Sequence, residues 1–263
     1  MENIEIFMNA FTHIIIFFMG TVFGSFFTLA VYRIPLKKDI THERSFCPNC
    51  NHRLEFLDLI PIFSYLFLKG RCRYCKEKIR IRYILLECLS GLVFLLGFIG
   101  LKILFPYNNV YMKLFLYVAF VFSYVTLALI AGIDKEYIKI NMGVLIFGTI
   151  VQSLYILNLC ILGTKINVYR YGIYLAILIV LIVINKVLDK KENRKYYLEF
   201  IALLTYVFYV LDYKMGLILF GVTIIQYLLL RFTLKKKELP LGFYLAVDTV
   251  IMMIIRNFMI FYI

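Results

Sequence analysis

Most of this 263-residue sequence consists of apolar runs that are long enough to cross a lipid bilayer as a helix. Such a crossing takes about 20 predominantly apolar residues, and 63% of the residues here are hydrophobic, with a mean hydropathy of +0.86. Eight runs can be drawn, of which the sixth and seventh are the weakest: roughly 7–32, 82–104, 111–132, 141–163, 170–188, 197–212, 215–231 and 242–262. The sequence therefore predicts an all-α polytopic membrane protein with about eight transmembrane helices.

The Lys and Arg residues are concentrated in the loops between these runs. The net charge of +13 would suit a protein that binds nucleic acid. The positive residues instead cluster in alternate loops. This pattern fits residues that set the orientation of the helices in the membrane and lie beside anionic lipid. The richest of these loops extends from Lys37 to Arg82, so we expect it to face the cytosol. The predicted partner is thus the lipid bilayer, with no nucleic acid.

The only long polar stretch carries two CxxC pairs. The pairs are separated by 21 residues and consist of Cys47, Cys50, Cys72 and Cys75. Two such knuckles can close a tetrahedral zinc site of four thiolates. Disulfides or free buried thiols are the alternatives. Eleven Lys and Arg residues between 34 and 82 mark a cytosolic and therefore reducing environment, in which disulfides are rare.

The domain organisation follows from these two patterns. We expect a first transmembrane helix over residues 1–33, a cytosolic zinc-binding insertion over 34–81, and a seven-helix membrane core over 82–263. Cys88 and Cys160 lie in apolar runs, where cysteine usually acts as a small packing residue.

Two acidic residues fall just inside apolar runs at the same expected membrane face. Asp134 ends the third run and Glu199 opens the sixth. Acidic residues near membrane depth are costly and usually functional. Two carboxylates held close together cannot both ionise, so one keeps a proton while the other can activate water. Alternatively, each carboxylate reaches water beside a basic loop, and the charge pattern leaves both interpretations open.

A series of motifs in residues 20–90 resembles one known family. Gly24 to Pro35 reads GSFFTLAVYRIP, close to the family motif GSFLNVVIYRLP, and is followed by both cysteine knuckles and by IRYILLE at Ile81 to Glu87. This series resembles the type IV prepilin peptidases, which are bifunctional leader peptidases and N-methyltransferases. Leu239 to Ala246 resembles the PFGPYLA segment of the same family.

The resemblance implies an intramembrane aspartic endopeptidase in the bacterial inner membrane. Such an enzyme removes the leader of prepilins or pseudopilins at the cytosolic face, in the service of pili, competence or secretion. It then methylates the new N-terminus with S-adenosylmethionine. Asp134 matches the first catalytic aspartate of the family. The resemblance also implies that the four cysteines bind zinc.

The second catalytic aspartate of the family lies in a GxGD motif, which is absent here. Glu199 takes its place, 65 residues after Asp134, and is preceded by Tyr196-Tyr197-Leu198 instead of glycines. The rival is Asp212, whose segment resembles GD-x-K-[LM], but eight spans would put it at the outer face, about 30 Å from Asp134. The missing GxGD also favours two alternatives: an inactive relative that binds prepilins as an assembly scaffold, and an enzyme that only transfers methyl groups.

Overall fold

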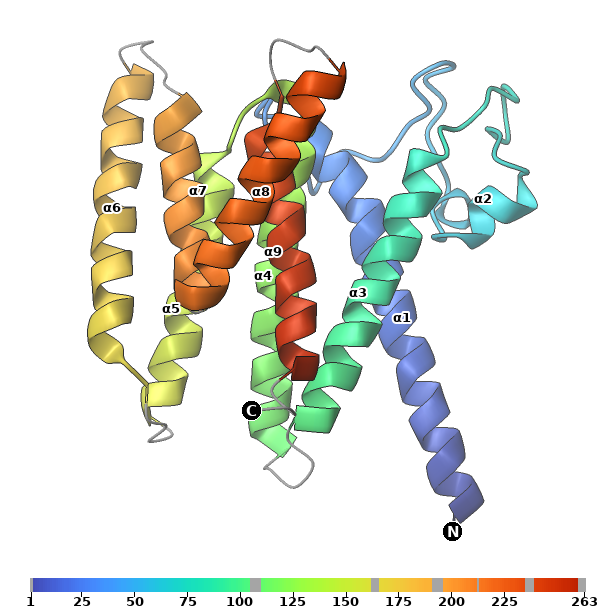
Figure 1. Ribbon diagram of the computed structural model, residues 1–263. Coiled ribbons are helices and arrows are strands. Elements are labelled where there is room, and N and C mark those ends of the chain that lie inside the picture. Colours follow the sequence, from blue (N-terminus) through green and yellow to red (C-terminus); the bar gives the residue numbers. More distant parts are fainter. Residues whose placement is uncertain are drawn as a thin grey trace. The chain divides into compact units, whose positions relative to one another are not determined.

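The computed structural model describes residues 2–104, 110–161, 166–190, 196–211, 213–234 and 239–259, and these ranges contain helices and no strand. The all-α prediction is confirmed. The elements, shown in Figure 1, are α1 (Glu2–Arg33), the 3-10 turn η1 (Phe56–Asp58), α2 (Phe63–Phe67), α3 (Arg82–Leu104), α4 (Val110–Tyr137), α5 (Met142–Ile161), α6 (Val168–Lys190), α7 (Tyr196–Val210), α8 (Tyr213–Leu234) and α9 (Leu241–Met259).

Seven of the described helices are long and apolar enough to cross a membrane, which makes the protein a multi-pass membrane protein. The predicted seventh run extends to the full 22 residues of α8, whereas the sixth run becomes α7, a shorter apolar helix of 15 residues. Helix α7 contacts α5, α6, α8 and α9, and its side chains Ala202, Leu203 and Tyr206 are fully buried. Other helices therefore pack against α7 on several sides.

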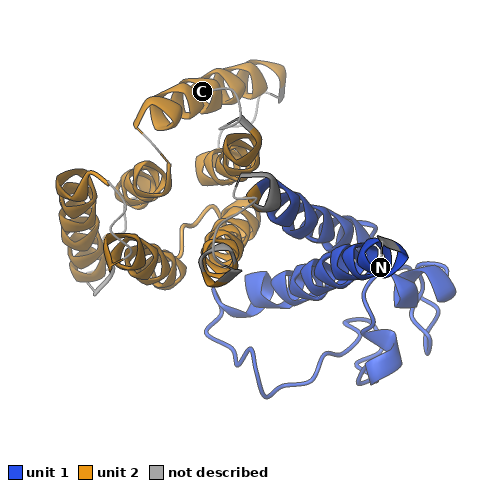
Figure 2. Cartoon of the chain, turned by 90° about the horizontal axis from the view of Figure 1, so that it is seen from below, with its two compact units in different colours: residues 1–100 blue, residues 101–263 orange. Residues whose placement is uncertain are grey.

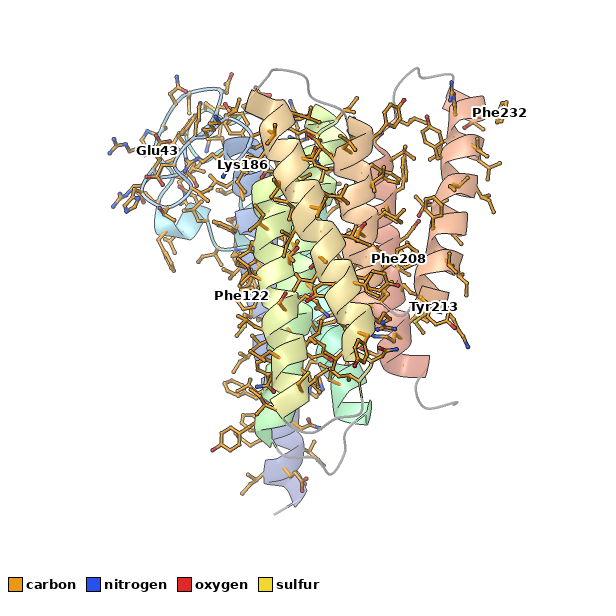
Figure 3. The ribbon with its side chains drawn as sticks, turned by 90° about the vertical axis from the view of Figure 1, so that its left-hand side faces the viewer. Glu43, Phe122, Lys186, Phe208, Tyr213 and Phe232 are labelled. Atoms are coloured by element: carbon orange, nitrogen blue, oxygen red, sulfur yellow. The ribbon has the colours of Figure 1, made fainter. Side chains whose placement is uncertain are left out.

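The long helices expose large apolar side chains over much of their length. On α8, Leu217, Ile225 and Phe232 are all exposed, and Figure 3 shows Phe232 pointing away from the neighbouring helices. Extended apolar surfaces of this kind mark contact with a membrane or a partner. On helices that can span a bilayer, lipid is the natural contact.

Internal contacts divide the chain into two compact units, residues 1–100 and 101–263, coloured separately in Figure 2. In the second unit, α4 packs against α5 and α9, and α8 packs against α9. Hydrogen bonds join the last turn of α4 to the first residues of α7 and α9. Three helix ends from distant parts of the sequence thus meet at one end of this unit.

In the first unit, α1 and α3 approach each other through small residues. Gly20 and Gly24 lie one turn apart on α1 and face α3. A Cβ atom at Gly20 would lie 2.6 Å from the carbonyl oxygen of Ser90, and one at Gly24 would lie 2.8 Å from the Cα of Glu87. This is the spacing by which membrane helices bring their backbones into contact.

Replacing Gly20 with Leu is expected to destabilise the first unit, because the added side chain would overlap the α3 backbone. Overpacking of this kind typically costs about 1–3 kcal/mol. The measurement is thermal unfolding of the full chain in mild detergent, followed by loss of helical circular dichroism. Gly172→Leu is the matched control, since a Cβ atom at Gly172 on α6 meets nothing within 4 Å. Equal unfolding temperatures for the two variants would contradict the prediction.

Candidate active site and metal centre

The two CxxC segments fold into matching turns. In the first, the N–H of Asn51 donates to the carbonyl oxygen of Cys47 at 2.8 Å, and in the second the N–H of Lys76 donates to that of Cys72 at 3.1 Å. Asn51 and Lys76 both adopt positive φ, 55° and 61°. Because each turn folds back in the same way, the two sulfur atoms of each pair face one point.

The four sulfur atoms of the knuckles form a single cluster. They all lie within 4.8 Å of one another, and the Sγ atoms of Cys47 and Cys75 are 3.8 Å apart. A tetrahedral Zn–S₄ site with Zn–S bonds of about 2.3 Å has sulfur–sulfur edges of about 3.8 Å. All six cysteines of the chain are free thiols. The donor set therefore fits a zinc ion in both kind and spacing.

The environment of Cys75 favours the thiolate form that a metal requires. The backbone N–H of Glu77, followed by the side-chain amide of Asn49, lowers the pKa of Cys75 to about 6. The Asn49 amide nitrogen lies 3.7 Å from the Cys75 sulfur. At neutral pH this thiol is accordingly prepared to act as a ligand.

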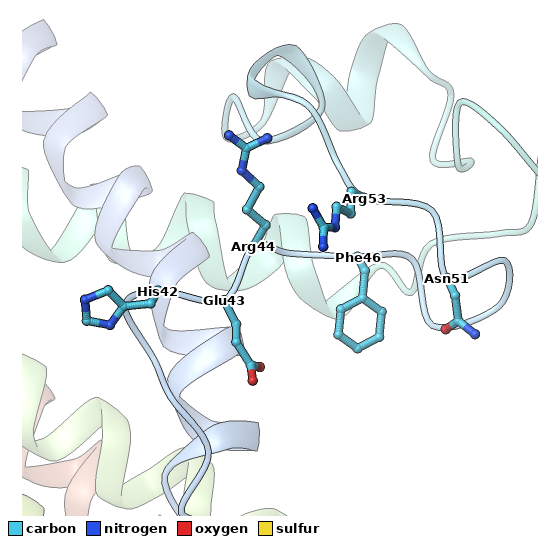
Figure 4. A pocket seen from close by; sticks show the side chains of 6 residues that line it. All are labelled: His42, Glu43, Arg44, Phe46, Asn51 and Arg53. Atoms are coloured by element: carbon cyan, nitrogen blue, oxygen red, sulfur yellow. The ribbon is translucent and has the colours of Figure 1, made fainter.

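A buried arginine fixes the loop that leads from α1 into the first knuckle. The guanidinium of Arg33 donates to the backbone carbonyl oxygens of Asp39 and Glu43, each at 2.9 Å, and to that of Arg44 at 3.3 Å. Beside this loop is a cavity of about 630 Å³, lined by His42, Glu43, Arg44, Phe46, Asn51 and Arg53. Figure 4 shows that the Glu43 carboxylate and the Phe46 ring point to the same side of the loop.

In the second unit, Asp134 and Glu199 belong to one buried cluster. Asp134 lies in the last turn of α4 and Glu199 in the first turn of α7, and their exposed fractions are 0% and 4%. Ile140 lies between them, because its Cδ1 atom and the Asp134 Oδ2 atom both lie beside Gly242. The Glu199 Oε2 atom accepts a hydrogen bond from the N–H of Ile140 at 3.1 Å. This bond ties α7 to the loop between α4 and α5.

The two oxygen atoms of Asp134 have different surroundings. Its Oδ2 atom accepts from the Tyr196 hydroxyl at 3.0 Å and from the N–H of Phe243 at 2.9 Å. The same hydroxyl accepts from the N–H of Gly242 at 3.1 Å. The Oδ1 atom is buried and has no hydrogen-bond partner among the described residues. One oxygen is thus held in place by α7 and α9, and the other takes part in neither of these hydrogen bonds.

Gly242 allows this close approach of α9 to α4. A Cβ atom at this position would lie 3.0 Å from Asp134 Oδ2 and 3.1 Å from the Cδ1 of Ile140. The sequence analysis did not identify Gly242 or Tyr196 as site residues. Both carried a signal: Tyr196 lies three residues before Glu199, on the same face of a helix, and Gly242 lies within the segment that resembles PFGPYLA.

The rival acid, Asp212, lies outside the described residues. Leu211, the residue before it, follows the end of α7 and is 12 residues beyond Glu199. At 1.5 Å per residue this is about 18 Å along the helix. The preference for Glu199 over Asp212 therefore stays a prediction.

Replacing Tyr196 with Phe is expected to lower the stability of the second unit by about 1–3 kcal/mol, the usual cost of a buried polar group left without its partner. The change removes the donor to Asp134 Oδ2 and the acceptor of the Gly242 N–H. Tyr197→Phe is the matched control, since Tyr197 is exposed. Thermal unfolding in detergent measures both variants, and an unchanged Tyr196→Phe would mean that its hydroxyl does not hold the cluster together.

The N-terminal third of the chain matches known proteins. Residues 18–101 match the bacterial peptidase A24 N-terminal domain. Proteins named prepilin leader peptidase/N-methyltransferase are 42% identical over 81 residues in Myxococcus xanthus, 39% over 88 in Klebsiella pneumoniae and 41% over 80 in Bacillus subtilis. The matched stretch is 31%, 31% and 30% of this chain but only 24%, 39% and 32% of those relatives, respectively. No solved structure matches the chain.

Proposed function

We propose that this protein is a membrane-embedded prepilin peptidase, because residues 18–101 match the bacterial peptidase A24 N-terminal domain and are similar to proteins named prepilin leader peptidase/N-methyltransferase. It cleaves the leader of type IV prepilin-like proteins at the cytosolic face of the bacterial cell membrane and methylates the new N-terminus. The observation that carries the proposal for proteolysis is the buried pair of Asp134 and Glu199, in which Asp134 Oδ1 has no partner among the described residues.

In this proposal Asp134 and Glu199 form the acid/base pair. Two buried carboxylates in mutual range share a proton, so that one is charged and one is neutral. The charged carboxylate takes a proton from water, whose oxygen attacks the scissile carbonyl carbon. The neutral carboxylic acid gives its proton to the departing amine nitrogen. Tyr196 and the N–H of Phe243 hold Asp134 Oδ2, which directs Oδ1 toward the water.

The four cysteines are proposed to bind a structural zinc ion. Four sulfur ligands complete the tetrahedral shell, which leaves no open position for a reactant. The role of the metal is therefore to hold the two knuckles together. The lysine- and arginine-rich loops and the knuckles face the cytosol in this proposal, as the positive-inside rule predicts.

The methyl donor implied by the names of the relatives is S-adenosylmethionine, which supplies an electrophilic methyl group. The cavity beside the first knuckle has a size typical of small-molecule sites. Its residues suit the donor in kind: Glu43 for a positive charge and the Phe46 ring for stacking on a base. Equilibrium dialysis of the full chain with radiolabelled S-adenosylmethionine tests this assignment, and Phe46→Ala is expected to weaken binding. The assignment is contradicted if the chain does not bind S-adenosylmethionine, or if Phe46→Ala leaves the binding unchanged.

Co-expression with a prepilin tests the proposed function as a whole. Loss of the leader, followed by gel mobility and mass, is the expected result, together with the added mass of one methyl group. An intact leader with tight co-purification of the prepilin would instead identify a scaffold that binds the substrate. Methylation of a separately prepared mature pilin, with no cleavage of the prepilin, would identify a methyltransferase alone.

A further inference from the structure

The first unit carries an apolar surface that the proposed function does not use. We call it the α2 face, and it consists of Phe56, Leu57, Leu66 and Phe67. The two phenylalanines are each 82% exposed and the two leucines 59%. Removing apolar surface from water is favourable, so a cluster of this size next to a membrane helix hairpin indicates contact with another apolar phase.

The α2 segment lies alongside the membrane helices and not beyond their ends. The N–H of Ile62 donates to the Glu87 carboxylate at 2.7 Å, and Glu87 is five residues into α3, about 8 Å from its start. The ring of Phe63 stacks on that of Phe18 at 5.6 Å between centroids. Phe18 is 15 residues from the end of α1, about 22 Å along the helix. Figure 1 shows α2 beside α3, below its first turn.

The backbone at the start of α2 is shaped for this attachment. The N–H of Phe63 donates to the carbonyl oxygen of Pro61 at 2.6 Å, and Ile62 between them has φ 64° and ψ −54°. This is a γ-turn of the strained kind, which persists only where the surrounding structure holds it. The turn leaves the N–H of Ile62 free to point at Glu87. The two anchors together hold α2 at a fixed height on the α1–α3 hairpin.

The charge around the α2 face is positive. Residues 34–81 contain ten Lys and Arg against five Asp and Glu, a net charge of +5. Lys69 and Arg71 follow α2 directly, whereas Arg73, two residues further on, donates from its Nε atom to Asp58 Oδ1 at 2.6 Å. Basic residues near an anionic membrane surface are attracted to it. Beside α2 is a hollow of about 210 Å³ with walls that are mostly apolar, lined by Leu57, Ile60, Phe63, Ser64, Phe67, Leu68 and Arg73.

We propose that the α2 face is inserted into the membrane leaflet on the side of the cysteine knuckles, and that it binds anionic phospholipid there. The phenylalanines and leucines enter the boundary between headgroups and acyl chains, and the basic residues after α2 meet the phosphates. An amphipathic segment with exposed aromatic residues and a basic surround binds membranes in this manner. The insertion of the α2 face thereby holds the polar knuckles against the membrane surface.

The chain contains no tryptophan, so a single Phe67→Trp substitution reports on this surface alone. The full-length variant is reconstituted in vesicles of phosphatidylcholine and phosphatidylglycerol, with or without lipids brominated near the upper part of the acyl chain. We expect blue-shifted emission that the brominated lipids quench at least twofold more strongly than that of Phe46→Trp. Phe46 is the matched control because it lies in the same unit, beside the first knuckle, and is half exposed.

Two further changes tie the signal to the proposed contacts. Glu87→Ala in the Phe67→Trp background is expected to reduce quenching by brominated lipid, because the anchor of Ile62 is lost; Glu87→Gln, which retains an acceptor, is expected to preserve it. Removing the phosphatidylglycerol is expected to reduce quenching as well. Unchanged quenching without the anionic lipid would overturn the assignment to that lipid class.

Two results for Phe67→Trp itself would overturn the proposal. Emission typical of water, with quenching by iodide and none by brominated lipid, would place the α2 face in solvent. Blue-shifted emission that brominated lipid does not quench would mean that protein covers the α2 face. That protein would be another part of this chain, a second copy of it or a substrate helix.

Discussion

Replacing Asp134 with Asn is expected to reduce cleavage of a prepilin leader by at least about 100-fold, the range in which loss of a general acid or base falls. The substitution is nearly isosteric, and the amide oxygen can still accept from Tyr196 and from the N–H of Phe243, which hold Oδ2 in the wild type. The amide cannot take a proton from water. The fold is therefore expected to persist while the chemistry stops.

The measurement is the rate of leader loss in detergent-solubilised or reconstituted protein, with unfolding temperature recorded alongside. Asp248→Asn is the matched control, since Asp248 is a carboxylate on α9 in the same unit, held by Thr223 at 3.1 Å and by Gln226 at 3.3 Å. Its replacement is expected to leave the cleavage rate within a few-fold. A fully active Asp134→Asn would remove the acid/base proposal.

Glu199→Gln separates the two candidates for the second acid. If Glu199 is the partner of Asp134, this variant loses cleavage to a similar degree, because an amide cannot exchange the shared proton. Retained cleavage in Glu199→Gln, together with loss in Asp212→Asn, would transfer the role to Asp212. That outcome would also mean that Asp212 reaches the cytosolic end of the bundle, contrary to the predicted order of spans.

The fold was largely predictable because its determinants are local. A long run of apolar residues predicts a helix that is removed from water, whether that helix then contacts lipid or protein. The same property explains the difference at α7: Ala202, Leu203 and Tyr206 are buried against other helices, and apolar side chains look alike in sequence whether they face protein or lipid. A helix enclosed by others has no need to match the thickness of the bilayer, so its length of 15 residues is compatible with its place.

The sequence could predict more of the cysteine cluster than of the surroundings of Asp134. The cysteine cluster was predictable because each pair is fixed by a four-residue turn, and only one long-range closure is required. The surroundings of Asp134 depend on residues 62 and 109 positions away, Tyr196 and Phe243. Periodicity within one helix carries no information about which residue of a distant helix it meets. Reading Tyr196 only as a lost glycine therefore missed that its hydroxyl bonds to the carboxylate.

Replacing Cys72 with Ser is expected to abolish stoichiometric zinc binding and to unfold the knuckles. Structural zinc sites supply about 10–16 kcal/mol to small metal-dependent peptides at neutral pH, far more than the turns of residues 34–81 could replace. This segment contributes few buried side chains apart from Cys47 and Cys72 themselves. The membrane helices have their own packing, including the close α1–α3 contact, and are expected to remain helical.

Metal content of the freshly purified, reduced protein measures the first effect, and the rate of trypsin cleavage within residues 34–81 measures the second. The segment contains ten Lys and Arg residues, so its unfolding is expected to raise the cleavage rate by at least about tenfold, since proteolysis follows the population of the open form. Cys88→Ser is the matched control: Cys88 lies on α3, outside the four-sulfur cluster, and both readouts are expected to match the wild type. A wild-type protein that holds no metal, or a Cys72→Ser variant that retains one equivalent, would show that the four thiols do not form a zinc site.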